Sequence, residues 1–247
     1  EMKVSIITAS YNSQKNILDA IESVKNQDYQ NIEHVFIDGN SSDKTLEIIE
    51  KNALPNSFIV SERDGGIYDA LNKGLNISSG DIVGFLHSDD TLMPHSLSSV
   101  VSRFNEYNGT DIVYGNIDYV SKNNPTNIVR KWRSGDFNLT KLRNGWMPPH
   151  TATFIKRDIY SKYGFFNTEF SISADYEILL RFLYERKVPA THLDEVLVKM
   201  RLGGESNRNL KLIAKKTAED FRILRKKNIN AFRAVPLKNM RKLFQFI

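Results

Sequence analysis

The chain contains an apolar run that ends in two adjacent carboxylates, Gly80-Asp81-Ile82-Val83-Gly84-Phe85-Leu86-His87-Ser88-Asp89-Asp90. Residues 82–86 are too few for a typical helix and are typical of a buried strand. A strand that ends in Asp89 and Asp90 places negative charge at the carboxyl edge of a sheet, where ligands bind in open α/β sheets. Such a pair holds a divalent cation such as Mg²⁺ or Mn²⁺, or takes part in acid–base chemistry. A third interpretation stays open, in which one of the two caps a helix that starts near Pro94.

The residues before this run alternate between strand-like and helix-like patterns. Short runs rich in β-branched and aromatic residues predict strands at 4–8, 34–37 and 58–61. Apolar residues at helical spacing predict helices at about 16–26, 44–51 and 67–75. This alternation is typical of a parallel, doubly wound sheet. Asp38 and Asp64 follow the second and third strands, so we expect their side chains to meet those of the fourth strand at one edge.

The second half of the chain has a less regular pattern. After a predicted helix at 94–105, the strand-like runs 112–116, 119–120 and 128–132 have no helices between them. They therefore predict a mixed or antiparallel extension of the sheet. Further elements are predicted as a strand at 151–155, a helix at 157–163, a helix that opens at 173–177, a strand at 196–200 and a Gly-rich loop at 202–206.

Composition limits the class of protein. The 247 residues are 40% hydrophobic and 26% charged, which is ordinary for a globular chain. There are no cysteines, which excludes disulfides and thiolate chemistry and fits a reducing cytoplasm. No apolar run approaches about 18 residues, so we expect no membrane-spanning helix. The first residues lead directly into a strand-like run, so we expect no signal peptide.

The positive charge of the chain is concentrated in residues 208–247, which we call the C-terminal tail. It holds twelve Lys and Arg and two acidic residues, a net +10, whereas the whole chain carries +5 and the remainder therefore −5. Apolar residues recur at helical spacing from Leu210 and again after Pro236. A basic amphipathic tail suggests contact with an anionic membrane or nucleic acid, and the lack of a nucleic-acid motif disfavours the latter. A helix packed on the body, or one that binds a partner, remains an alternative.

Four loops, in this order, resemble those of family 2 glycosyltransferases with the GT-A fold. They are Thr8-Ala9-Ser10-Tyr11-Asn12, Phe36-Ile37-Asp38-Gly39-Asn40-Ser41-Ser42-Asp43-Lys44-Thr45, Gly66-Ile67-Tyr68-Asp69-Ala70-Leu71-Asn72-Lys73-Gly74 and Leu86-His87-Ser88-Asp89-Asp90. The resemblance covers about residues 3–206. It implies an α/β, Rossmann-like and mostly parallel sheet flanked by helices, followed by the basic helical tail. Residues 1–207 would form the GT-A domain, with a nucleotide-binding half at 1–115 and an acceptor half at 116–207.

The resemblance implies that the loops after the first and second strands bind the nucleotide. Asp38 would accept a hydrogen bond from the edge of a uracil-like base, and Asp64 and Lys73 would lie near the nucleoside and the diphosphate. A carboxylate suits a ring N–H and an ammonium group suits phosphate, although Lys73 also fits a solvated helix position. The residues implied in nucleotide-sugar binding are Thr8, Ser10, Tyr11, Asn12, Asp38, Asp64, Lys73, His87, Ser88 and Arg201.

The metal motif of the family is Asp-X-Asp, and this sequence departs from it. His87 stands at the first Asp position, where it would touch the metal or the ribose, and Asp89 stands at the second. Asp89 is therefore the first choice of metal ligand and Asp90 the second. A divalent cation there, Mn²⁺ or Mg²⁺, would bridge the donor diphosphate. Arg201 and Ser206 belong to a Gly-rich loop of the kind that closes on the diphosphate.

Asp175 matches the position of the family's catalytic base. As a base it would take the proton of the acceptor hydroxyl while that oxygen attacks the anomeric carbon, with inversion. Asp175 also suits capping of the helix that begins at Tyr176. His150 would lie near the acceptor or the metal, although a lone histidine is more often structural. Glu177 is a weaker acceptor-site candidate because it faces differently from Asp175.

The resemblance thus implies an inverting glycosyltransferase that uses a nucleotide-sugar, most naturally a UDP-sugar, and a saccharide or lipid-linked acceptor. Relatives of this kind act in bacterial surface polysaccharide assembly, of O-antigen or capsule type. We therefore expect a cytoplasmic protein, peripheral at the inner face of the membrane through the C-terminal tail, and no nucleic-acid partner. The alternatives are a degenerate saccharide- or membrane-binding module, and a sugar-1-phosphate nucleotidyltransferase. The latter expects a Gly-rich loop after the first strand, where residues 9–12 contain no glycine.

Overall fold

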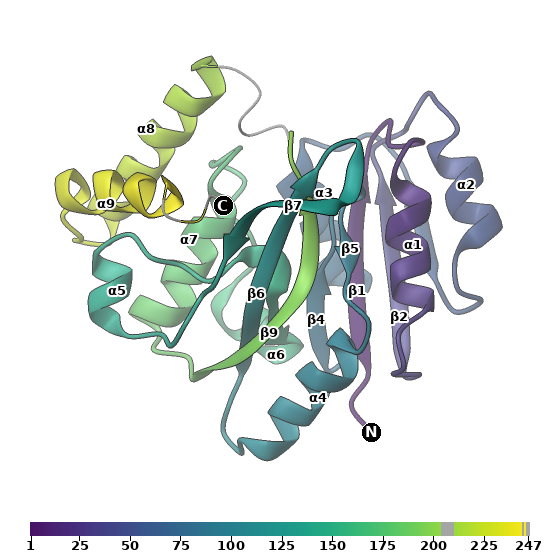
Figure 1. The fold of residues 1–247 in the computed structure, drawn as a ribbon, viewed down its shortest axis with the longest axis horizontal. Coiled ribbons are helices and arrows are strands. Elements are labelled where there is room, and N and C mark those ends of the chain that lie inside the picture. The colour runs from purple at the N-terminus through teal and green to yellow at the C-terminus, as the bar shows by residue number, and fades with distance from the viewer. Residues whose placement is uncertain (204–209, 244, 246–247) are drawn as a thin grey trace.

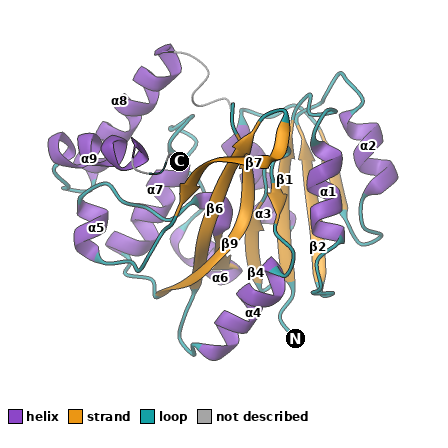
Figure 2. Ribbon diagram, viewed as in Figure 1, coloured by secondary structure: helices purple, strands orange, loops and turns teal. Residues whose placement is uncertain are grey.

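The fold is built on one large sheet. The computed structural model describes residues 1–203, 210–243 and 245. Its strands are β1 (Val4–Ser10), β2 (Ile32–Asp38), β3 (Phe58–Ser61), β4 (Ile82–Phe85), β5 (Thr91–Leu92), β6 (Ile112–Ser121), β7 (Asn124–Trp132), β8 (Thr153–Lys156) and β9 (Ala190–Arg201). They lie in the order β3-β2-β1-β4-β8-β6-β9-β5, and β7 pairs with β6 (Figures 1 and 2).

Helices cover both faces of this sheet. The helices of the described residues are α1 (Ile17–Lys25), α2 (Thr45–Asn52), α3 (Ile67–Ile77), α4 (Ser96–Glu106), α5 (Leu139–Arg143), α6 (Arg157–Tyr163), α7 (Ala174–Leu180), α8 (Leu210–Lys226) and α9 (Ala231–Leu243). Helices α8 and α9 lie beyond α7, away from the sheet (Figure 1). A 3₁₀ turn at His150–Ala152 precedes β8, and a π-helical turn at Arg181–Glu185 continues α7. Helices α1 and α4 pack on one face, and α3 and α7 pack on the other (Figure 1).

The first half of the sheet has the predicted parallel arrangement. Strands β3, β2, β1 and β4 are all parallel neighbours. The chain adds β2 and β3 on one side of β1 and then places β4 on the other side. The carboxyl ends of β1 and β4 therefore flank a topological switch point, the usual ligand site of such sheets. The α/β fold with a mostly parallel sheet and flanking helices is confirmed.

The second half contains the predicted mixed extension. Strand β8 runs antiparallel to both β4 and β6, while β6 and β9 run parallel. Because β8 is antiparallel to β4, the turn before β8 reaches the carboxyl end of β4. This brings His150 next to Phe85, with stacked rings whose centroids are 4.9 Å apart. A segment more than sixty residues away in sequence is thereby added to the switch point.

Several element boundaries differ from those expected. The runs 112–116 and 119–120 form one strand, β6, and β9 begins at Ala190 instead of near residue 196. Helix α9 begins at Ala231 and contains Pro236, whereas we expected an amphipathic piece only after that proline. The earlier start has a local cause, because the side chain of Asn230 accepts a hydrogen bond from the Arg233 N–H and caps the helix.

The C-terminal tail packs against the body of the protein. Ile223 and Leu224 of α8 and Ala234 of α9 are fully buried, and they belong to the same core cluster as Phe170 and Tyr176. The apolar face of the tail is therefore packed on the body, as in one of the alternatives considered from the sequence. None of the helices that the structure describes is long and apolar enough to cross a membrane.

Candidate active site

Asp38 is the last residue of β2, and its carboxylate accepts four hydrogen bonds. Its Oδ1 accepts the hydroxyls of Ser10 and Ser41, at 3.2 and 2.5 Å. Its Oδ2 accepts the backbone N–H of Ser41 at 2.9 Å and the hydroxyl of Ser61 at 2.8 Å. The side chain is fully buried. Asp38 thus ties together the loops after β1, β2 and β3, and a ligand could reach it only by displacing one of these partners.

Thr8, expected in the nucleotide pocket, is also fully buried. Its hydroxyl lies 2.9 Å from Nε2 of His34 on the neighbouring strand β2. Burial lowers the pKa of His34 to about 3, so its ring is neutral at physiological pH. Thr8 and Ser10 are therefore buried under the loops at the sheet edge. The exposed surface of the site is formed by the residues that follow them in the sequence.

Tyr11, Gly39 and Asp64 border a common surface beyond the strand ends. Tyr11 is 66% exposed, so much of its side chain is accessible. A Cβ atom added at Gly39 would lie 2.8 Å from Oδ2 of Asp64 and 3.4 Å from Cδ2 of Tyr11. Oδ1 of Asp64 accepts the N–H of Gly66 at 2.9 Å. An open aromatic ring beside a carboxylate suits a nucleobase, which stacks on one and donates a ring N–H to the other.

Further hydrogen bonds fix the three loops that the sequence brings to this edge. The side-chain Oδ1 of Asn12 accepts the N–H of Ser42 at 2.9 Å, which joins the loops after β1 and β2. The hydroxyls of Ser13 and Ser88 lie 2.8 Å apart and join the loops after β1 and β4. These contacts span the switch point and give it a fixed shape.

Lys73 is on α3 and is held by acidic neighbours. Its Nζ lies 2.7 Å from Oε1 of Glu62 and 3.6 Å from Oδ2 of Asp69, and it donates to the carbonyl of Arg63 at 3.1 Å. The hydrogen bond that Lys73 donates to Glu62 raises the pKa of its amine. A phosphate would have to compete with both carboxylates for Lys73.

His87, Asp89, His150 and Asp175 form one electrostatic cluster at the carboxyl end of β4. Burial lowers the pKa of His87, while the carboxylates of Asp89 and Asp175 oppose the shift. Burial likewise lowers the pKa of His150 to about 4, opposed by Asp175 and reinforced by His87. Both imidazoles are therefore neutral at pH 7, and each has a lone pair that can accept a proton or bind a cation.

Asp90, next to Asp89 in the sequence, is hydrogen-bonded to Arg201. Oδ1 of Asp90 accepts the backbone N–H of Arg201 at 3.1 Å, and Oδ2 has no partner among the described residues. Burial and the adjacent Asp89 raise the pKa of Asp90 well above its usual range. The side chain of Arg201 turns to α1, where it pairs with Asp19. Arg201, which we expected in a Gly-rich loop, is the last residue of β9. Ser206, expected in the same loop, lies outside the described residues.

Asp175 is in the first turn of α7, and Tyr68 supports it. Oδ1 of Asp175 accepts the Tyr176 N–H at 2.8 Å and faces the Tyr68 hydroxyl at 3.2 Å. The Tyr68 hydroxyl also donates to the carbonyl of Ile172 at 2.7 Å. Because a hydroxyl has a single proton, the shorter bond to Ile172 is the stronger of the two. Oδ2 of Asp175 accepts no hydrogen bond from the described residues. Tyr68 lies in a quoted loop motif, but nothing in the sequence indicated this contact.

Glu177 does not join the cluster. It forms ion pairs with Arg181 at 2.7 Å and with Lys227 of α8 at 3.0 Å, and it is 8% exposed. Although burial opposes the shift, hydrogen bonds and charge from Arg181 and then Lys227 lower its pKa. Glu177 therefore joins α7 to the C-terminal tail, and we leave it out of the site.

The donor set at the end of β4 fits a divalent cation shared with a substrate. Asp89 and Asp90 offer carboxylate oxygens, and Oδ2 of Asp90 is a buried acceptor without a partner among the described residues. Among the described residues, no group of three or more His, Asp or Glu side chains is arranged to hold a metal ion without further ligands. Mg²⁺ and Mn²⁺ prefer oxygen ligands, and Mg²⁺ is usually bound through one or two carboxylates together with substrate phosphates and water. The protein thus supplies part of a coordination shell.

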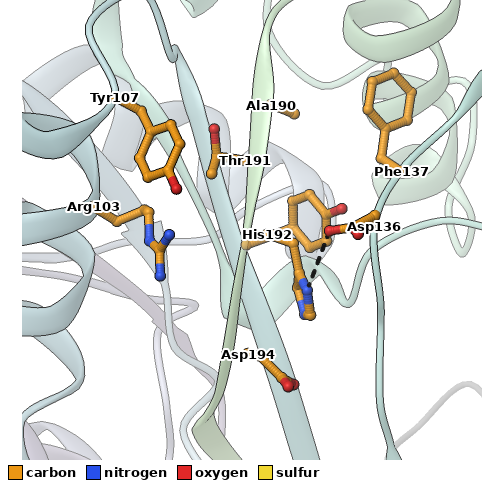
Figure 3. A pocket seen from close by; sticks show the side chains of 9 residues that line it. Arg103, Tyr107, Asp136, Phe137, Ala190, Thr191, His192 and Asp194 are labelled. Carbon is orange, nitrogen blue, oxygen red and sulfur yellow. Dashed lines mark ion pairs between the residues drawn. The ribbon is translucent and has the colours of Figure 1, made fainter.

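A separate cavity of about 540 Å³ lies at the other end of β9 (Figure 3). Its lining includes His192, whose Nδ1 is 3.8 Å from Asp136, together with Tyr107 and Arg103. At about 3.3 Å per residue, His192 is about 30 Å along the strand from Arg201. This cavity is therefore not part of the cluster around Asp89 and Asp175.

Comparisons with known proteins identify the family and the fold. Residues 5–164 match the model of Glycosyl transferase family 2, and the chain belongs to that family. An uncharacterized glycosyltransferase of Mycobacterium tuberculosis is 31% identical over 194 residues, which cover 72% of this chain and 68% of the relative. A PGL/p-HBAD biosynthesis glycosyltransferase of Mycobacterium bovis is 28% identical over 208 residues, with coverages of 82% and 78%. The protein is thus a glycosyltransferase, related to one that acts in PGL/p-HBAD biosynthesis.

Solved structures share the fold at lower identity. TarS of S. aureus in complex with UDP-GlcNAc has a TM-score of 0.65 at 18% identity, covering 90% of this chain and 67% of that one. The chain spans 42% of another crystallised form of TarS. The mannosyltransferase PcManGT of Pyrobaculum calidifontis, in complex with GDP-Man and Mn²⁺, has a TM-score of 0.67 at 16% identity, with coverages of 96% and 69%. The GT-A fold is thereby confirmed.

Proposed function

We propose that this chain is an inverting glycosyltransferase that transfers a sugar from a nucleoside diphosphate donor to an acceptor hydroxyl. The observation that carries the proposal is that His87, at the carboxyl end of β4, lies within electrostatic range of the carboxylates of Asp89 and Asp175. The exposed side chain of Tyr11 follows β1, the strand next to β4. These positions support a site in which the contacts to the diphosphate, the general base and the contacts to the nucleobase share one edge of the sheet. The donor nucleotide is proposed as UDP, although TarS and PcManGT were solved with UDP- and GDP-sugars respectively.

In this proposal the donor lies across the switch point. The base stacks on Tyr11 and donates its ring N–H to Asp64, because Asp38 already accepts four hydrogen bonds. The diphosphate lies over Ser88 and Asp89, with His87 at its side. A divalent cation held by Asp89 and Asp90 would neutralise charge on the departing diphosphate. His150 borders the acceptor side.

Asp175 acts as the general base. Its carboxylate takes the proton from the acceptor hydroxyl as that oxygen forms a bond to the anomeric carbon. The bond between that carbon and the phosphate oxygen breaks, and the nucleoside diphosphate leaves with the electron pair. Attack opposite the leaving group inverts the anomeric configuration. Hydrogen bonds reach only Oδ1 of Asp175 from the described residues, so Oδ2 is the oxygen proposed to take the proton.

The test measures nucleoside diphosphate release from a panel of UDP- and GDP-sugars. We expect Asp175→Asn to bind the nucleotide as wild type does and to lower turnover about 10²–10⁴-fold, the usual contribution of a general base. Asp158→Asn, an exposed acid in the first turn of α6, is the matched control. Wild-type turnover in Asp175→Asn would refute the proposed role. Nucleotide binding without turnover in the wild type would indicate a degenerate binding module.

The acceptor is proposed to be lipid-linked, with the protein held at an anionic membrane surface by the C-terminal tail. Two large apolar side chains of α9 are exposed, Phe232 at 81% and Met240 at 51%. Exposed basic residues accompany them: Lys211, Lys215, Arg222, Arg225, Lys226 and Arg233. Basic residues near an anionic surface contribute about 1 kcal/mol each, and apolar side chains add to this by insertion.

A further inference from the structure

The C-terminal tail carries two adjacent acidic residues, Glu219 and Asp220, and both face inward. They are 7% and 4% exposed, although six of the ten basic residues whose side chains are described in the tail are exposed. Buried carboxylates require hydrogen-bonded partners because desolvation is costly. Glu219 bonds directly to residues just before Asp175, and Asp220 pairs with Lys238, which contacts the residue just after it.

Glu219 holds the loop that leads into α7. Its Oε1 accepts the backbone N–H and the hydroxyl of Ser171, both at 3.1 Å. Its Oε2 accepts the N–H groups of Ile172 and Ser173, both at 2.9 Å. One carboxylate thus collects donors from three consecutive residues that end two positions before Asp175. Hydrogen bonds to a charged acceptor are about twice as strong as neutral ones, so this is a firm attachment.

Asp220 acts on the other side of Asp175 through Lys238 of α9. The Lys238 ammonium lies 2.8 Å from Oδ2 of Asp220 and 3.4 Å from the centre of the Tyr176 ring. A cation over an aromatic face is attracted by the ring quadrupole, more strongly when both are buried. Lys238 is 9% exposed and Tyr176 is 1% exposed. The residue directly after Asp175 is therefore also fixed by the tail.

We propose that Glu219 is a positioning residue for Asp175, so that the C-terminal tail forms part of the catalytic unit. The inference rests on the proposed role of Asp175. Glu219 touches no reacting atom in this account. It fixes the start of α7 and the Ile172 carbonyl that receives the Tyr68 hydroxyl, and this sets the place of the Asp175 carboxylate.

Glu219→Gln tests the inference because it keeps the size of the side chain and replaces one acceptor oxygen by an NH₂ group. That group would face N–H donors in place of accepting them. We expect amide hydrogen exchange at residues 171–173 to become about tenfold faster or more. We expect turnover of the best donor in the panel to fall about 10- to 100-fold, as for a catalytic group displaced by about 1 Å, with the nucleotide affinity unchanged.

The control and the double variant separate positioning from general stability. Glu185→Gln removes one ion pair between the body and Lys227, at 2.7 Å, and leaves residues 171–173 untouched, so it should retain wild-type exchange and turnover. In an Asp175→Asn background, Glu219→Gln should cause no further loss, because the group that it positions is already gone. If Glu219→Gln does not fold, Glu219→Asp is the second variant. It keeps the charge but has a side chain shorter by one methylene, so its carboxylate should no longer reach residues 171–173, and exchange and turnover should change in the same directions.

Faster exchange at 171–173 with turnover within twofold of wild type would overturn the inference alone, and so would a fully additive loss in the double variant. Unchanged turnover in Asp175→Asn would overturn the proposed function and the inference with it.

Discussion

At the scale of single residues, the site depends on carboxylates and imidazoles whose environments differ. Asp38 is buried and saturated by four donors, while Asp64 borders an exposed tyrosine ring. Both follow strands of the same sheet, and the sequence predicted both positions. It could not show which carboxylate is saturated, because the hydroxyl of Ser61 that completes the shell of Asp38 comes from another strand. The same holds for Glu177, whose partner Lys227 is fifty residues away.

His34 makes stability depend on pH. Its ring is fully buried, with Nε2 bonded to Thr8, and burial lowers its pKa to about 3. The unfolded chain takes up a proton below about pH 6.5, whereas the folded protein does not until about pH 3. The stabilisation is therefore present above pH 6.5 and is lost as the pH falls. At 1.36 kcal/mol per pH unit, His34 alone should lower the free energy of unfolding by about 2 kcal/mol between pH 7.5 and pH 5.

Denaturant unfolding of wild type and His34→Gln at both pH values measures this contribution. Glutamine can still bond to Thr8 but does not titrate. We expect the variant to lose about 2 kcal/mol less than wild type over the same interval, because all other titrating groups are shared. An equal loss in both proteins would show that His34 does not contribute.

At the scale of elements, the first four strands and their helices follow directly from local sequence patterns. Apolar residues in α1 and α3 recur at helical spacing, and the strands between them are short β-branched runs. The tail was less predictable. Its charge indicated a surface role, but the burial of Ile223 and Leu224 depends on their packing in one core cluster with residues of α7, which no local pattern shows.

Leu224 should therefore behave as a core residue of the whole domain. Its side chain is fully buried, so Leu224→Ala should lower the free energy of unfolding by about 2–5 kcal/mol. Ile213 is in the same helix but 43% exposed, and Ile213→Ala should change stability by about 0.5 kcal/mol or less. Urea unfolding followed by circular dichroism compares the two. A small effect of Leu224→Ala would mean that α8 does not pack on the body in solution.

At the scale of the whole molecule, charge and structure divide the chain into two surfaces. The tail carries a net +10 and the remainder −5. Because α8 and α9 complete the core, removal of residues 208–247 would expose apolar surface and cannot test membrane contact cleanly. Substitutions on the exposed face of α8 leave the core intact and are the better test.

Sedimentation with vesicles measures the proposed membrane contact. Wild type should bind vesicles that contain anionic lipid and should not bind neutral ones. Lys211→Glu with Lys215→Glu changes the charge by −4 on the exposed side of α8, so binding should fall by at least about tenfold. Phe58→Ala, which removes an exposed aromatic ring on β3 in the body, is the matched control. Undiminished binding of the charge-reversed protein would contradict a role for the tail.

The central claim is that a nucleoside diphosphate and a divalent cation bind together at the end of β4. Calorimetry with UDP and with GDP, each with and without Mn²⁺, tests this most directly. We predict Mn²⁺-dependent binding, tighter for UDP, that weakens at least about tenfold in Asp89→Ala and is retained in Asp81→Ala, which changes an exposed acid at the opposite end of β4. Binding that ignores both Mn²⁺ and Asp89, or no binding by the folded protein, would contradict the account.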